Sequence, residues 1–102
     1  MGKLDRRYVA LSIKHSQDRG LAWWGRSRTE DDEERCYSGY VSDPEEAEVY
    51  DLKEFEEAHG LSGTCYLYAP IVPTRDILKR YKSFNTVFMT LDDARKLKEM
   101  MQ

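Results

Sequence analysis

The chain has 102 residues, of which 40% are hydrophobic and 34% are charged, and its formal net charge is −3. A chain of this length buries roughly two-thirds of the surface that its unfolded form exposes, so one ordinary core is feasible without metal or disulfides. The acidic balance argues against a surface built throughout for nucleic acid, because that attraction needs clustered lysine and arginine. We therefore expect one folded domain over residues 1–102 that does not bind nucleic acid directly.

The sequence also carries information about the compartment. No apolar run reaches the roughly 18 residues of a membrane span, and the start "MGKLDRRYVA" lacks the apolar core of a signal peptide. The expected location is the cytoplasm, with no membrane contact. In that reducing compartment Cys36 and Cys65 are expected to be free thiols, and whether they meet is left open.

The N-terminal part predicts an antiparallel three-stranded meander. In "RRYVALSIKH", Val9, Leu11 and Ile13 share one parity, which predicts a strand from Arg7 to His15 with one buried face. After the turn "SQDRG", the stretch "LAWWGRS" predicts a second strand, in which Gly25 indicates a bulge or a close approach of the backbone. The stretch "RCYSGYVS" resumes the alternation and is expected to pair antiparallel with the second strand.

A run of five acids, Glu30 to Glu34, separates the second and third predicted strands. Adjacent carboxylates repel one another and require water on both sides, so the run cannot continue a half-buried strand. It predicts a loop with a strong negative charge.

Helices and strands are expected to alternate after this meander. The stretch "DPEEA" is a break, and "AEVY" is either a short strand or an irregular connection. In "DLKEFEEAHG", Asp51 caps a predicted helix, Glu54 completes a capping box, and Gly60 ends the helix. The stretch "TCYLYAP" predicts a strand, and "PTRDILKRYKSF" predicts a helix opened by Thr74.

The last two elements are a strand in "NTVFMTL" and a helix in "TLDDARKLKEMMQ". Thr90 caps that helix with Asp93 three residues on, and Ala94, Leu97 and Met101 face inward. The whole order predicts an α+β fold, in which an N-terminal antiparallel three-stranded meander precedes alternating helices and strands.

No catalytic, metal or cofactor motif stands out. The possible soft ligands are His15, Cys36, His59 and Cys65, and none lies at the short spacing of a zinc site. The six glycines occur singly, so no glycine-rich loop is present to hold a phosphate. Basic residues gather at "KLDRR", "GRSR" and "LKRYK", but acids lie near them, and a solvated face is the default interpretation. We expect a protein without metal or cofactor that is not an enzyme.

The aromatic residues supply the best candidate for a recognition surface. Trp23 and Trp24 are adjacent, so in a strand they point to opposite faces. Trp23 shares its parity with Leu21 and is predicted in the core, whereas Trp24 shares its parity with Arg26 and is predicted on the more exposed side. Tryptophan, tyrosine and arginine dominate contact energy at interfaces. The candidate binding residues are Trp24, Arg26, Arg28, Glu30, Asp31, Asp32, Glu33, Tyr37 and Tyr40.

The first functional hypothesis is a small inhibitor or adaptor that binds a partner protein. Its acidic loop would steer it to a basic surface, such as the nucleic-acid groove of an enzyme. A small acidic protein of this kind suggests an accessory protein of a phage or mobile element, including one that blocks a host defence nuclease.

Two alternatives stay open. One is a small-molecule or nucleotide-binding domain, with or without enzymatic activity, whose pocket is formed by Trp24, Tyr37 and Tyr40 together with Arg26 and Arg28. The other is a structural homo-oligomer that pairs through an edge strand. The sequence is compatible with a monomer or a homodimer, and it leaves strand order and partner identity open.

Overall fold

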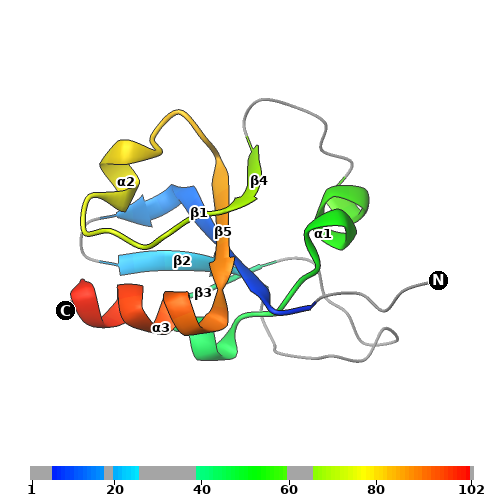
Figure 1. The fold of residues 1–102 in the computed structure, drawn as a ribbon, viewed down its shortest axis with the longest axis horizontal. Coiled ribbons are helices and arrows are strands. Elements are labelled where there is room, and N and C mark those ends of the chain that lie inside the picture. Colours follow the sequence, from blue (N-terminus) through cyan, green and yellow to red (C-terminus); the bar gives the residue numbers. More distant parts are fainter. Residues whose placement is uncertain (1–5, 18–19, 26–38, 60–65, 102) are drawn as a thin grey trace.

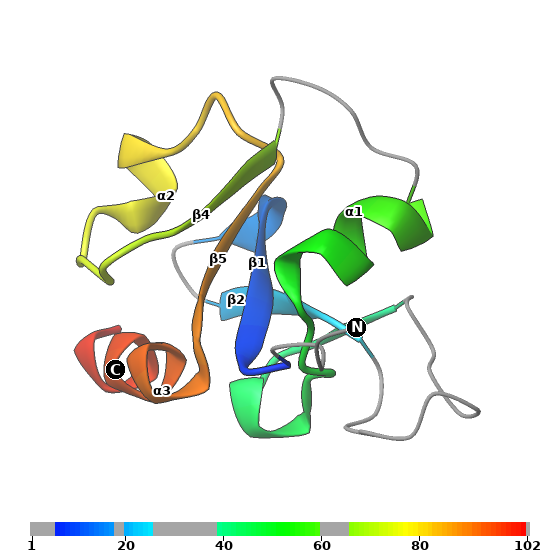
Figure 2. The same cartoon turned by 45° about the vertical axis from the view of Figure 1, so that its right-hand side comes forward.

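A five-stranded mixed sheet with the strand order β3-β2-β1-β5-β4 organises the fold (Figures 1 and 2). The computed structural model describes residues 6–17, 20–25, 39–59 and 66–101. The elements in chain order are β1 (Tyr8–Gln17), β2 (Gly20–Trp24), β3 (Tyr40–Val41), the 3-10 helix η2 (Pro44–Glu46), α1 (Leu52–His59), β4 (Tyr66–Pro70), α2 (Ile77–Arg80), β5 (Thr86–Thr90) and α3 (Leu91–Met100).

The predicted α+β fold and its N-terminal meander are confirmed. Strand β2 pairs antiparallel with β1, with Leu11 opposite Trp23, and β3 pairs antiparallel with β2, with Val41 opposite Trp23. On the other side of β1, β5 pairs antiparallel and β4 then adds parallel to β5. The C-terminal strands thus extend the meander into one mixed sheet.

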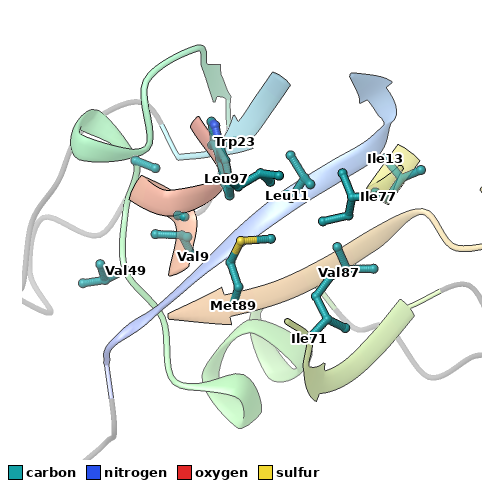
Figure 3. Close-up of a cluster of buried hydrophobic side chains, with 12 residues drawn as sticks. Val9, Leu11, Ile13, Trp23, Val49, Ile71, Ile77, Val87, Met89 and Leu97 are labelled. Atoms are coloured by element: carbon teal, nitrogen blue, oxygen red, sulfur yellow. The ribbon is translucent and has the colours of Figure 1, made fainter. Parts of the chain in front are cut away.

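One face of this sheet carries the larger core, as the alternation in the strands predicts. Val9, Leu11 and Ile13 of β1 pack with Trp23, and all four side chains are buried. Figure 3 shows them together with side chains from β5, α2 and α3. The contributions of these three elements are Val87, Met89, Ile77, Ala94 and Leu97.

The opposite face carries a smaller aromatic core under α1. Figure 2 shows α1 on one side of the sheet and α2 with α3 on the other. Phe55 of α1 contacts Tyr50 with ring centroids 4.9 Å apart and Phe88 of β5 at 5.0 Å. Ala10 completes the buried set. Because Trp23 and Trp24 point to opposite faces of the sheet, both faces need to be covered. Helix α1 covers the face on which Trp24 lies.

Two predicted helix caps are confirmed by hydrogen bonds. At α1 the Asp51 Oδ1 accepts from the Lys53 N–H at 2.9 Å, and the Glu54 Oε2 accepts from the Asp51 N–H at 3.2 Å. At α3 the Thr90 Oγ1 accepts from the Asp93 N–H at 3.2 Å. Each bond satisfies an N–H that the first helical turn leaves without a partner.

Helix α2 differs from its prediction, because Thr74 does not open it. The helix spans Ile77–Arg80 and its N-terminal cap position is Asp76. The backbone carbonyl of Thr74, not its hydroxyl, accepts from the Ile77 N–H at 3.2 Å, which closes a turn before the helix. A second turn, in which the Phe84 N–H donates to the Tyr81 carbonyl at 2.9 Å, follows soon after the helix. Only Ile77 of this helix is buried, so tertiary packing supports a single turn.

Gly25 is a point of close backbone approach, as predicted. Its φ is +96°, and a Cβ added there would lie 2.4 Å from the Glu48 Cβ. Its N–H donates to the Gly39 carbonyl at 2.9 Å. The chain around Glu48 continues as an irregular connection that meets β1 through one bridge, between Tyr50 and Tyr8. That bridge is what "AEVY" contributes to the sheet.

Candidate functional site

Two of the predicted binding residues, Trp24 and Tyr40, lie in the part of the chain that the structure describes, and there they are neighbours. They are directly opposite each other on β2 and β3, with ring centroids 4.9 Å apart. The other predicted binding residues lie outside the described residues; they are Arg26, Arg28, Glu30, Asp31, Asp32, Glu33 and Tyr37.

Trp24 is half-buried and held from two directions. Its indole Nε1–H donates to the Thr86 Oγ1 of β5 at 3.1 Å. Its ring meets Phe55 of α1 edge-on, with centroids 5.5 Å apart. The ring is thus both part of the aromatic core and the support for Tyr40.

Tyr40 is the exposed member of this arrangement. It keeps 40% of its surface accessible although its ring lies between Trp24 and His15. The His15 and Tyr40 ring centroids are 4.7 Å apart. The aromatic row, His15–Tyr40–Trp24, therefore runs from an exposed imidazole to the buried rings under α1.

Partial burial of the Tyr40 phenol raises its pKa above the ordinary value, and the neighbouring Tyr66 acts in the same direction. A hydrogen bond with the Ser12 side chain lowers it and only partly offsets these two effects. Tyr40 is therefore a neutral hydrogen-bond donor at physiological pH, as an ordinary tyrosine is, and the raised pKa moves its ionisation further from that range.

The sequence did not place His15 beside Tyr40, because this residue was considered only as a possible metal ligand. His15 lies in an irregular part of β1, where the β1–β2 register shifts between Ser12 and Gln17. Two serine side chains replace regular ladder bonds there. The Ser12 Oγ accepts from the His15 N–H at 3.2 Å, and the Ser16 Oγ donates to the Ser12 carbonyl at 2.6 Å. The Ser16 Oγ also accepts from the Ala22 N–H at 2.8 Å. Such bulges redirect side chains, and no simple alternation rule locates them.

The aromatic row presents three ring side chains next to one another. Its groups offer ring surfaces, a phenol and an imidazole. Within the described ranges, no group of three or more His, Cys, Asp and Glu side chains could hold a metal ion. Across those same ranges no helix is long and apolar enough to span a membrane.

A concavity of about 930 Å³ lies elsewhere, beside the C-terminal end of β1, α2 and the end of α3. Trp24 and Tyr40 do not line it. The concavity is therefore not the pocket that the sequence predicts around these two aromatic residues. Part of the concavity's lining comes from the basic cluster "LKRYK", which the sequence had assigned to a solvated face.

Comparisons of this chain with protein-family models, with curated proteins and with solved structures gave no match.

Proposed function

We propose that this protein is a non-enzymatic binding protein that docks on a partner protein through the aromatic row, as a small inhibitor or adaptor. The observation that carries the proposal is that the aromatic row combines a half-buried, fixed side chain, Trp24, with an exposed one, Tyr40. Trp24 is held by a hydrogen bond and an edge-on ring contact, while Tyr40 beside it is 40% exposed as a residue.

Rigid aromatic side chains whose rings remain accessible favour binding. Such residues contribute large contact area and lose little conformational entropy when they bind, because few torsions have to be frozen. Tyr40 is already held by His15 and Trp24 at centroid distances of 4.7 and 4.9 Å. Its phenol and the imidazole of His15 add polar groups at the rim of the surface.

The chain between the two aromatic strands suggests the chemistry of the partner. The acids Glu30 to Glu34 lie in sequence between Trp24 and Tyr40. Their charge would attract a basic surface over distances of about one Debye length, roughly 8–10 Å at physiological salt. A nucleic-acid groove of an enzyme is such a surface. The role we propose on this basis is inhibition of a host nuclease, as by an accessory protein of a phage or mobile element.

The proposal is tested by measuring binding to purified bacterial nucleases with basic grooves, with and without competing duplex DNA. Tyr40→Ala should weaken binding to a nuclease that the wild-type protein binds by about tenfold or more, because truncating an aromatic anchor removes about 2 kcal/mol. Duplex DNA should compete with the wild-type protein for the same groove.

Val72→Ala is the matched control, because Val72 is 75% exposed and lies outside the aromatic row. It should bind as the wild-type protein does. Equal loss in both variants, or binding that Tyr40→Ala leaves intact, would contradict the proposed surface. Nuclease binding that duplex DNA does not affect would contradict the proposed mode of inhibition.

A further inference from the structure

The concavity of about 930 Å³ brings together residues far apart in the sequence. Lys14, Ser16 and Gln17 come from the end of β1, eight residues between 75 and 85 come from α2 and its flanking turns, and Met101 follows α3. Figure 1 shows α2, the end of β1 and the C-terminus on the same side of the molecule. None of these residues belongs to the aromatic row.

The lining of the concavity is basic although the protein as a whole is acidic. Lys14, Arg75, Lys79 and Lys82 line it against a single carboxylate, Asp76. Its charged side chains therefore sum to +3 in a chain whose formal net charge is −3.

None of these four cations forms an ion pair with another residue that the structure describes. Asp76, the nearby acid, pairs instead with Arg80 at 3.5 Å. Several cations elsewhere do have carboxylate partners, and the pairs are Arg6 with Glu54, Arg95 with Glu45 and Asp92, Lys96 with Asp93, and Lys98 with Asp43. Among the residues that the structure describes, the cations that form no ion pair are thus concentrated around the concavity, where an anionic ligand would complement their charge.

The rest of the lining is divided between apolar and hydrogen-bonding side chains. Ile13, Leu78 and Phe84 supply apolar surface. Phe84 is partly buried and lies 6.3 Å from the Tyr81 ring, centroid to centroid. The polar side chains are Ser16, Gln17, Ser83 and Asn85. A ligand that fits this lining has an anionic part and a flat, partly apolar part with hydrogen-bonding edges.

The backbone around β1 fixes one wall of the concavity. The carbonyl of Asn85 accepts from the N–H groups of Ile13 and Lys14 at 2.8 and 3.3 Å. The Asn85 Oδ1 also accepts from the Thr86 hydroxyl at 3.2 Å. The same irregularity that directs His15 to the aromatic row begins here, and it places the neighbouring Lys14 in the concavity. These hydrogen bonds restrict the wall, and a restricted wall lowers the entropic cost of binding.

We propose that this concavity binds a nucleotide, specifically a nucleoside di- or triphosphate. Lysine and arginine side chains would hold the phosphates, and the base would lie against the apolar surface near Phe84. The volume lies within the roughly 300–1,000 Å³ of typical small-molecule sites. A glycine-rich loop is unnecessary, because the anion is held by side chains. The assignment does not depend on the proposed protein partner.

The test is a titration with magnesium-free ATP, followed by calorimetry and by amide chemical shifts. ATP should bind and shift the amides of Ser16, Ser83 and Asn85 most. Adenosine and tripolyphosphate should each bind at least about tenfold more weakly, because each lacks one of the two parts that the lining fits. Equal affinity for tripolyphosphate would overturn the assignment to a nucleotide. Binding of oligothymidylate without binding of ATP would overturn it as well.

A pair of variants locates the site. Lys79→Gln with Lys82→Gln removes two exposed charges from the concavity and should weaken ATP binding by about tenfold or more. Lys53→Gln with Lys96→Gln removes the same charge from α1 and α3, outside the concavity, and should change the affinity less than about twofold. Equal effects of the two pairs, or no ATP binding by the wild-type protein, would overturn the proposal.

Discussion

Gly25 occupies a position where any other residue would be strained. Its φ of +96° is unfavourable for any other residue, and an added Cβ would meet both the Cβ and the backbone N of Glu48, at 2.4 and 2.8 Å. Gly25→Ala should therefore lower the free energy of unfolding by about 2 kcal/mol or more, measured by urea denaturation.

Gly20 is the control for this prediction, because a Cβ added there meets nothing within 4 Å. Gly20→Ala should change stability by less than about 1 kcal/mol. Similar losses for both glycines would mean that the contact with Glu48 does not constrain the chain.

The adjacent tryptophans have different surroundings, and their replacement should separate them. Trp23 is fully buried among the larger core, so Trp23→Ala should cost about 3–5 kcal/mol. Trp24 is half-buried, and Trp24→Ala removes the bond to Thr86 and the contact with Phe55, with a smaller expected cost of about 1–3 kcal/mol. Urea denaturation of both variants measures the two costs. A cost for Trp24 as large as that for Trp23 would assign both residues to the core alone.

At the scale of elements, the irregular end of β1 is the feature on which both candidate sites depend. The hydroxyl of Ser16 accepts from Ala22 and donates to Ser12, so it connects β1 and β2 where the ladder is interrupted. Ser16→Ala should cost about 1–2 kcal/mol, because it leaves the Ala22 N–H without its acceptor. Amide hydrogen exchange should show faster exchange at Ala22, whereas the exposed Ser83→Ala should leave that amide unchanged. Unaltered exchange at Ala22 in Ser16→Ala would contradict this account of the bulge.

At the scale of the whole molecule, the acidic run should act on association and not on folding. Replacing Asp31, Asp32 and Glu33 by serine should slow association with a basic partner and flatten its dependence on salt. The melting temperature should barely change, because charges exposed to water contribute little to stability. Stopped-flow or sensor kinetics at low and high salt measure this effect. Unchanged association at low salt would leave the run without a role in steering.

The aromatic row and the concavity have no lining residue in common, so the two proposed activities should be separable. Tyr40→Ala should leave ATP affinity unchanged. Lys79→Gln with Lys82→Gln should leave nuclease binding unchanged. In a double-mutant cycle that combines Tyr40→Ala with the two lysine changes, the interaction energy for nuclease binding should stay below about 0.5 kcal/mol. A larger value would contradict the independence of the two sites and would indicate coupling through the irregular end of β1.

Local patterns were sufficient for much of the fold and for part of the candidate site. Alternation in β1 identified Val9, Leu11 and Ile13 as core, and parity assigned Trp23 to the same face. Capping residues located the starts of α1 and α3. These features are predictable because neighbouring residues alone determine them, through the geometry of a strand or of a first helical turn. The proximity of Trp24 and Tyr40 followed from the expected hairpin pairing.

The tertiary structure decided the features that depend on contacts between distant segments. It placed β5 beside β1 and β4 outside it, limited α2 to one turn, and put α1 over Trp24. It also interrupted the β1–β2 ladder, and that interruption brought His15 to Tyr40 and Lys14 to the cations of α2. The periodicity of a single segment cannot predict these contacts, because they depend on which segments pack together and in which register.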